Sequence, residues 1–235
     1  VIRHLLTHPH VSKDARQSWP GYVPGAIPWL HAWVDVKSMF TSDGADHQRL
    51  KTLVGRAFAA RRIDAMRPAI AAIVTSLLDN LTHHPPGAVV DLRERFTYRV
   101  PTQVICDLVG VPADQRPTML HVIDQVLTTD TTPAHAETIR RGLLHTMQTL
   151  IETKRHAPGE DMTSLLLTAH DGDRLSEDEL LSTLILMIGA GSQTAVALLN
   201  HAIRELLTHP GQLAAVRQAP GRWKDVIDKA GIELE

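Results

Sequence analysis

A run of polar side chains interrupts the most apolar part of this sequence and is its first candidate for chemistry. Residues 185–199 read ILMIGAGSQTAVALL, in which Ser192, Gln193 and Thr194 directly follow Gly191. A hydroxyl group can donate and accept a hydrogen bond at once, so Thr194 suits a proton relay. Each glycine inside a helix costs up to about 1 kcal/mol relative to alanine, so some other interaction should offset this cost.

The residues alone leave two roles open for this polar segment. In the first, Gly191 lets a flat or bulky ligand approach the backbone, and Thr194 presents its hydroxyl on the same face as Ala190. In the second, the small residues mark a helix crossing and Thr194 bonds back to the carbonyl of Ala190. The residues by themselves favour the second role, because threonines in helices commonly bond in this way. A dinucleotide-binding loop is excluded, since the third glycine of that motif is missing and the preceding residues keep helical periodicity.

Two other residue groups have types that could bind a ligand. His47 and Lys51 stand one helical turn apart and so share a face; without further information they read as a solvated helix surface. Cys106 lies among apolar neighbours in QVICDLVG, where a small buried thiol is the ordinary interpretation.

We expect no metal site from the remaining candidates. The single cysteine of the chain excludes an internal disulfide framework and any multi-cysteine metal site. His4 and His8 are spaced as a metal-binding pair on a helix, with His10 beyond a proline, but no acidic ligand is near. We therefore interpret all three as surface histidines.

Most of the chain is predicted to fold as helices separated by proline and glycine. The expected helices cover about 44–58, 63–81 with an interruption at Pro68, 101–109, 113–129, 134–155 and 176–209, and residues 18–40 form a long loop. Ser176 and Glu179 form a capping box that starts the last helix, a rod of about 50 Å at 1.5 Å per residue. Because this rod is hydrophobic nearly all round, it should lie inside a domain that is all-α, or α with a minor sheet.

Composition sets limits on the partners of the protein. The chain has 235 residues, 43% of them hydrophobic, and a formal net charge of -2, which makes nucleic acid an unexpected partner. We find no segment with the roughly 18 uncharged apolar residues that span a bilayer and no leader sequence. These features predict a soluble cytoplasmic protein with no membrane partner.

Three stretches, taken in order, resemble landmarks of one enzyme family, the bacterial cytochromes P450, which are haem-thiolate monooxygenases. GADHQRLKTLVGRAFAARRIDAMRPAI resembles the C helix of that family, ICDLVGVPADQR its E helix, and DGDRLSEDELLSTLILMIGAGSQTAVALLNHAIRELLTHP its long central I helix. The likeness covers nearly all of residues 1–228. It implies a mainly α, P450-like helical domain with a long central I helix, from which most of the small β-sheet region is missing.

The resemblance assigns a catalytic role to the polar segment. Residues 190–194 occupy the A-G-x-acid-T motif of the family, so Ala190 and Gly191 would contact the haem, and Thr194 would hold the waters that deliver protons for oxygen activation. Gln193 stands where the family has an acid. An amide can orient water but cannot pass a proton through an ionised state, so proton delivery here is expected to differ.

The resemblance also assigns binding roles outside that motif. His47 matches a residue that binds a haem propionate, and Lys51 stands where the family has an arginine. A lysine offers a point charge without the bidentate fork of arginine. Met187, Ala190 and Gly191 would line the substrate pocket together with the loop 18–40 and the connector near 129–135.

Two features of the family are missing from this chain. The loop that carries the haem-ligating cysteine is absent, and residues 229–235 replace the expected E-x-x-R motif. At the other end the chain enters within the region that resembles the B helix. We therefore expect one incomplete domain over 1–235 with no metal ligand of its own, in which the central helix exposes apolar surface.

The resemblance implies the following function for a complete family member. It would hydroxylate an apolar small molecule, a lipophilic polycyclic compound being our guess, with O2, haem iron and electrons from a ferredoxin-type donor. This chain alone is expected to be inactive, because the thiolate cysteine is missing. The alternative is a truncated or degenerate haem-free helical protein with a non-catalytic interaction role.

Overall fold

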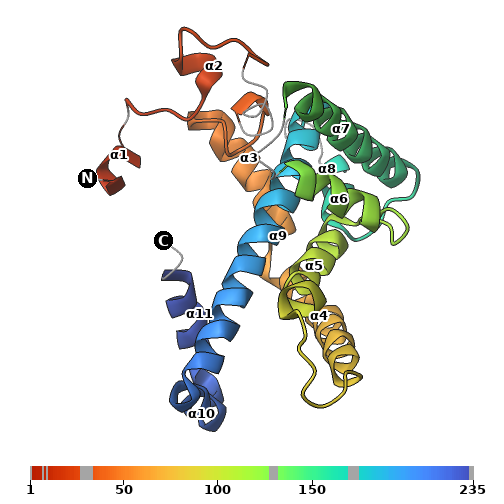
Figure 1. The fold of residues 1–235 in the computed structure, drawn as a ribbon. Helices are drawn as coiled ribbons and strands as arrows, with labels where there is room; N and C mark the ends of the chain where they lie inside the picture. The colour runs from red at the N-terminus through yellow and green to blue at the C-terminus, as the bar shows by residue number, and fades with distance from the viewer. Residues whose placement is uncertain are drawn as a thin grey trace. The chain divides into compact units, whose positions relative to one another are not determined.

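The structure, a computed structural model, describes residues 2–6, 8, 10–26, 34–126, 132–168 and 175–232 (Figure 1). Within these residues every regular element is a helix and there is no strand. The elements are α1 (Ile2–Leu6), α2 (Ala15–Ser18), α3 (Gly44–Ala57), α4 (Ala60–Thr82), η3 (Arg93–Thr97), α5 (Arg99–Val109), α6 (Arg116–Val126), α7 (Pro133–His156), α8 (Met162–Leu167), α9 (Glu177–Thr208), α10 (Pro210–Gln218), η4 (Pro220–Arg222) and α11 (Trp223–Ile232). The predicted mainly α fold class is confirmed.

Most predicted helices have the expected positions, and one prediction was wrong. Pro68 does not interrupt α4, which runs through it for 23 residues. A proline removes one backbone donor and fixes φ near the helical value, and a helix of this length retains its bonds on both sides. Parts of two predicted loops, residues 27–33 of the loop 18–40 and 129–131 of the connector, lie outside the described residues.

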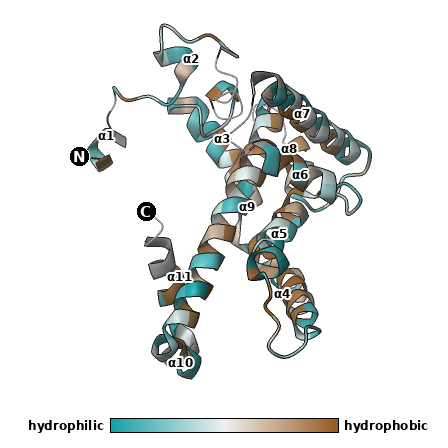
Figure 2. Ribbon diagram, in the orientation of Figure 1, coloured by the Kyte–Doolittle hydropathy of each residue, from teal (hydrophilic) through white to brown (hydrophobic). Residues whose placement is uncertain are grey.

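Contacts divide the chain into two compact units, which we describe separately. The first contains Val1–Ala65 and Cys106–Gly189. In it α6 packs on α7, and α8 packs on both α7 and α3. Figure 2 shows hydrophobic residues recurring between hydrophilic ones along α7, as expected for a helix with one buried side. The core is built from fully buried side chains of these helices and of α9: Leu50, Met119, Met147, Leu150, Met162, Leu184 and Ile188.

A buried carboxylate joins α9 to α3 within the first unit. The backbone N–H of Ser176 donates to Glu179 at 2.9 Å and the N–H of Glu179 donates to the Ser176 hydroxyl at 3.2 Å, which confirms the predicted capping box. Glu179 also pairs with Arg49 at 2.6 Å and with Lys37 at 3.3 Å. Burial alone would raise the pKa of Glu179, but hydrogen bonds from Arg49, Ser176 and Lys37 outweigh it and lower the pKa below its usual 4.5.

The same unit has a tight turn where α5 ends. Gly110 has a φ of 85°, and the carboxylate of Asp161 lies directly over it, so that a Cβ at position 110 would fall 2.2 Å from Asp161 Cγ. Asp161 accepts from the N–H of Ser164 at 2.9 Å, which caps α8, and pairs with Lys154 at 2.7 Å. Only glycine tolerates this conformation and this close approach together.

The second unit contains Met66–Ile105 and Ala190–Glu235. Here η3 is tied to α9 by a hydrogen bond from the Thr97 hydroxyl to the Asn200 side chain. The helices α10 and α11 both pack on the short η4 between them. Leu77 of α4, Ile105 of α5 and Val196 of α9 are among the buried apolar side chains of this unit.

The central helix α9 is long and apolar enough to cross a membrane, and part of its surface is exposed. By length and composition it could cross a membrane, with a mean hydropathy of 1.6 over 18 residues, so the statement that no such segment exists was wrong. Half of that segment is buried inside the protein, which is usual for a core helix and makes the membrane evidence weak. The helix is not covered all round, because Ala190, Gly191, Thr194 and Ala197 are exposed.

Candidate functional site

The polar segment forms an exposed side of α9 in the second unit. The helix continues without a break through residues 190–197, where Ala190, Gly191 and Thr194 are exposed while Ser192 and Val196 are buried. The exposed residues have small side chains, so the helix backbone is accessible along this side. We refer to Ala190, Gly191, Thr194 and Ala197 as the open stripe.

The Thr194 hydroxyl forms a hydrogen bond within its own helix. It donates to the carbonyl oxygen of Ala190 at 2.6 Å, which confirms the interpretation of this residue that the sequence favoured. A hydroxyl has one proton and two lone pairs, so in this state the exposed oxygen of Thr194 can accept a hydrogen bond but has no proton left to donate.

Gly191 is the point where α5 comes close to α9. A Cβ at position 191 would lie 2.9 Å from Cδ1 of Ile105 and 3.6 Å from its Cγ1. This agrees with the interpretation of the small residues as a helix crossing. Because Gly191 is nevertheless exposed, its other side remains open to a ligand.

Two predicted site residues of α9 have less open positions. Gln193 is half-buried, and its side chain is an amide that cannot ionise. Met187 belongs to the first unit and is only 8% exposed, so its side chain forms part of the core there. A substrate contact by Met187 stays a prediction.

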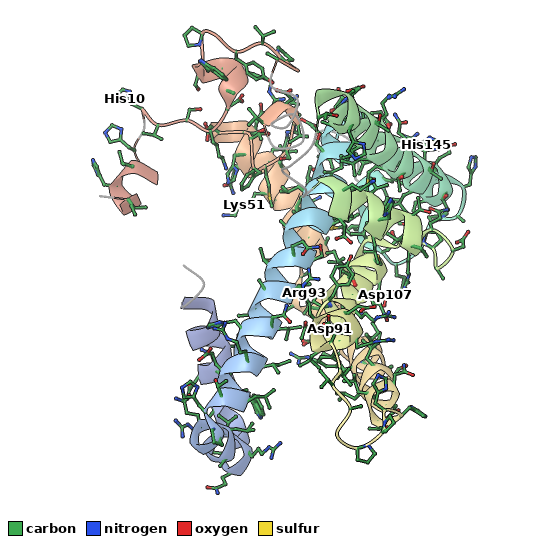
Figure 3. The ribbon with its side chains drawn as sticks, viewed as in Figure 1. His10, Lys51, Asp91, Arg93, Asp107 and His145 are labelled. Atoms are coloured by element: carbon green, nitrogen blue, oxygen red, sulfur yellow. The ribbon has the colours of Figure 1, made fainter. Side chains whose placement is uncertain are left out.

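The second candidate site lies at the start of α3 in the first unit. His47 is half-buried, and its Nδ1 lies 2.7 Å from the carbonyl oxygen of Met39. Lys51, one turn later, is exposed and projects from α3 (Figure 3); it forms no hydrogen bond or ion pair with any described residue. Both basic side chains could therefore meet an anionic group.

The sequence interpretation missed a third basic residue here. The ammonium group of Lys13 lies 3.2 Å from His47 Nδ1 and donates to the same Met39 carbonyl at 2.9 Å. Lys13 stands 34 positions before His47, and no local pattern links the two residues.

Cys106 has the buried position predicted for it. The residue is 0% exposed, and burial raises the pKa of its thiol to about 11, with smaller effects from Arg116 and Asp107. The thiol is thus protonated at neutral pH when no metal is bound, and its sulfur is enclosed by the protein interior, where a haem iron does not reach it. Cys106 does not fit the role of an axial haem ligand.

No group of three or more metal-ligating side chains in the described part of the chain could hold a metal ion. His4 and His8 meet edge to face, with ring centroids 5.1 Å apart, and the rings of His8 and His10 are 5.5 Å apart.

Comparison with known proteins gives the family of this chain. No family model matches it. The 2-hydroxy-5-methyl-1-naphthoate 7-hydroxylase of Streptomyces carzinostaticus is 38% identical over 97% of the chain, and the vitamin D(3) 25-hydroxylase of Pseudonocardia autotrophica is 34% identical over 97%. The solved structure of CYP154A1 from Streptomyces coelicolor A3(2) is 47% identical over 97% of the chain and superposes with a TM-score of 0.87. The chain belongs to the cytochrome P450 family.

The match does not extend over the whole of these P450 proteins. The chain spans 57% of the length of the naphthoate hydroxylase, 55% of the vitamin D(3) hydroxylase and 57% of CYP154A1. The predicted resemblance, including its partial coverage, is confirmed.

Each unit by itself has residues that could contact a haem. In the second unit the open stripe gives a flat ligand access to the α9 backbone, and in the first unit Lys13, His47 and Lys51 could meet carboxylates. The axial thiolate is the part that the only cysteine of the chain does not supply.

Proposed function

We propose that this chain supplies the distal haem-contacting part of a cytochrome P450 monooxygenase. The observation that carries this proposal is the open stripe, where Ala190, Gly191 and Thr194 are exposed in the middle of α9, although Ile188 before them and Val196 after them are buried. A soluble cytoplasmic enzyme is the form we propose, with α9 as a core helix.

Haem, when bound, supplies the redox-active iron for chemistry with O2. Ala190 and Gly191 would let the ring lie against the α9 backbone. The Thr194 oxygen would hold a water molecule by accepting a hydrogen bond from it, since the Thr194 proton is directed to Ala190. For Thr194 to donate a proton itself, that bond to the helix must first break.

Gln193 places a side chain that cannot ionise beside the proposed proton path. Its amide can orient a water molecule but holds no proton that titrates near neutral pH. Proton delivery beside Thr194 would therefore depend on water exchange rather than on a carboxyl group at position 193.

For the substrate we propose an apolar ring compound, hydroxylated with electrons from a ferredoxin-type donor. The support is the naphthoate and the vitamin D(3) in the names of the two hydroxylases, which share 38% and 34% identity with this chain. Met187 stays a proposed substrate contact. The donor class rests on the family alone.

A haem titration followed by Soret absorbance tests the role of the open stripe. Ala190→Leu adds bulk to the exposed side, and we expect it to weaken haem binding by about tenfold or more, because the ring can no longer approach the backbone. Ala214→Leu, at an exposed alanine of α10, is the matched control and should bind as the unchanged chain does. Equal affinities for all three proteins would refute the contact.

The alternative function, a haem-free helical interaction protein, is favoured by one observation. The only cysteine is fully buried, so the chain offers no accessible thiol to a haem iron. The same titration separates the two functions: absence of haem uptake by the unchanged chain supports the alternative, and saturable uptake contradicts it.

A further inference from the structure

The last turns of α9 and the helices that follow them line a pocket in the second unit. Its volume is about 530 Å³, and α9, α10 and α11 each contribute to its walls (Figure 1). The apolar part of the lining includes Ala202 and Leu206 of α9, Val216 of α10 and Val226 of α11, of which Val216 is buried. Small-molecule sites are usually pockets of this kind, with an apolar lining and a few polar groups that fix the orientation of the ligand.

Two carboxylates on different helices of this pocket have unused hydrogen-bonding capacity. Glu205 of α9 is half-buried, and Arg204 donates to its Oε1 from Nε at 3.0 Å and from Nη2 at 2.9 Å. Its Oε2 accepts no hydrogen bond from the described residues, and His209 Nδ1 lies 3.6 Å away from it. Asp225 of α11 is exposed and forms a loose ion pair with Arg222 at 3.8 Å, which is beyond hydrogen-bonding distance.

The charges of the lining favour an organic cation as the ligand. Glu205 and Asp225 are acidic and Arg222 is basic, so negative charges outnumber positive ones while His201 and His209 are neutral. A metal ion does not fit, because no group of three or more metal-ligating side chains in the described part of the chain could hold one. An ammonium group has three N–H donors and no acceptor, so it can donate to carboxylates of two helices at once. Such charge-assisted hydrogen bonds are about twice as strong as neutral ones.

We propose that this pocket binds a primary alkylamine in its ammonium form. The ammonium group donates to Oε2 of Glu205 and to the carboxylate of Asp225, and the alkyl chain lies along the apolar side chains of Ala202, Leu206 and Val226. None of these residues belongs to the open stripe, so the inference does not depend on the proposed function.

Isothermal titration of the whole chain with n-hexylamine at about pH 8 tests the inference, because an alkylamine is protonated there as a lysine side chain is. A ligand of this size should bind with a Kd of about 1 mM. 1-Hexanol, which has the same chain and no charge, should bind about tenfold or more weakly. n-Butylamine should also bind about tenfold more weakly than n-hexylamine, because it buries two fewer methylene groups.

Two variants test the carboxylates, and a third is their control. Asp225→Asn and Glu205→Gln keep the size of each side chain and should each weaken n-hexylamine by about five- to tenfold, with little effect on 1-hexanol. Asp228→Asn neutralises an exposed carboxylate of the same helix that pairs with Lys224 and does not line the pocket, so it should bind as the unchanged chain does. If Glu205→Gln fails to fold because it loses Arg204, then Asp225→Asn, which has no close partner to lose, decides the result.

Four results would overturn the inference. The first is the absence of saturable n-hexylamine binding by the unchanged chain. The second is equal affinity for n-hexylamine and 1-hexanol, which would show that the pocket does not recognise the ammonium group. The third is equal affinity for n-butylamine and n-hexylamine, which would place the amine on the charged surface rather than along the apolar lining. The fourth is an affinity for n-hexylamine that is the same in Asp225→Asn as in Asp228→Asn.

Discussion

A Cβ at position 191 would lie 2.9 Å from Cδ1 of Ile105, whereas one at position 189 would meet nothing within 4 Å. The two glycines of one helical segment therefore have different reasons to be small. Gly191 allows α5 to approach α9 in the second unit. Gly189 meets no such neighbour, and its backbone freedom only weakens the helix.

This difference predicts opposite outcomes for two alanine substitutions. Gly189→Ala should raise the free energy of unfolding by about 0.5–1 kcal/mol, because alanine favours the helix and fills open space. Gly191→Ala should gain the same propensity but lose it again as the Ile105 side chain is displaced. Urea denaturation of both variants measures this, and an equal gain at position 191 would show that the contact with Ile105 is loose.

Gly110, in the turn after α5, and Gly87, in the turn after α4, form a second matched pair of glycines. Gly110 and Gly87 have φ angles of 85° and 82°, but only Gly110 has a carboxylate where a Cβ would be. Gly87→Ala should cost about 1 kcal/mol for its left-handed backbone, and Gly110→Ala about 3 kcal/mol because Asp161 must also move. Thermal unfolding compares them, and similar losses would contradict the packing of Asp161 over Gly110.

Glu179 predicts how stability depends on pH in the acid range. Its lowered pKa means that the ionised form stabilises the fold above the usual value of 4.5, and that this contribution is lost as the pH falls through the lowered pKa. Glu179→Gln should cost about 2 kcal/mol at pH 7, since it removes the buried negative charge that pairs with Arg49 and Lys37. The difference from the unchanged protein should shrink on acidification, and a constant difference would rule out the charge as its cause.

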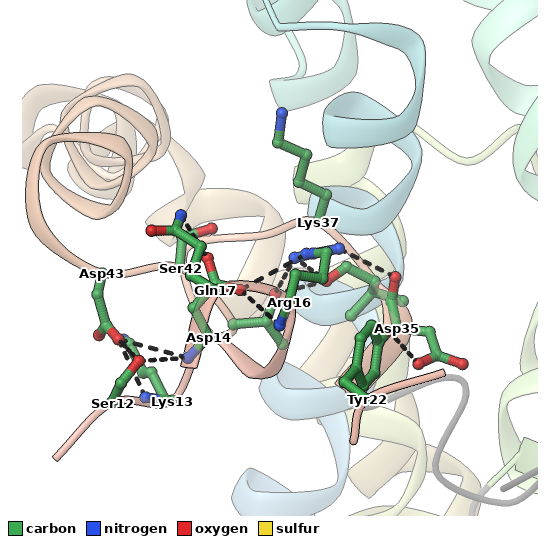
Figure 4. Close-up of polar contacts among 12 residues, drawn as sticks. Ser12, Lys13, Asp14, Arg16, Gln17, Tyr22, Asp35, Lys37, Ser42 and Asp43 are labelled. Carbon is green, nitrogen blue, oxygen red and sulfur yellow. Dashed lines mark hydrogen bonds and ion pairs between the residues drawn. The ribbon is translucent and has the colours of Figure 1, made fainter. Parts of the chain in front are cut away.

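Tyr22 makes a corresponding prediction at alkaline pH. Burial, together with a hydrogen bond that its hydroxyl donates to Asp35, raises its pKa to about 12 (Figure 4). The unfolded chain loses this proton near pH 10, so the contribution of Tyr22 is complete below pH 10 and is lost as the pH rises through 12. A spectrophotometric titration of Tyr98→Phe, in which Tyr22 is the one remaining tyrosine, should show this late ionisation; a midpoint near 10 would contradict it.

Local patterns predicted the elements, and contacts between distant segments supplied what they could not. The capping box of Ser176 and Glu179 and the burial of Cys106 depend on neighbours in sequence, and both were predicted. The contact of Lys13 with His47 joins residues that lie 34 positions apart, which no local spacing reveals. Membership of the P450 family was predicted from the order of several stretches rather than from any one motif.

The sequence pattern of α9 also could not predict which side of the helix is exposed. Periodicity described α9 as apolar nearly all round, and we expected it to lie inside a domain while exposing some apolar surface, but nothing in the pattern indicated which residues would be exposed. The open stripe exists because neighbouring helices cover only part of that surface, a property of packing that the pattern of one helix does not contain.

The most direct test of the proposed function is a spectrum of the purified chain with haem, reduced and exposed to carbon monoxide, recorded beside that of Cys106→Ser. We predict saturable haem uptake by both proteins and, in both, no long-wavelength Soret band of thiolate ligation, because the Cys106 sulfur is fully buried and out of reach of the iron. Absence of haem uptake would contradict the distal haem site. A thiolate band that disappears in Cys106→Ser would contradict the structural role of that cysteine.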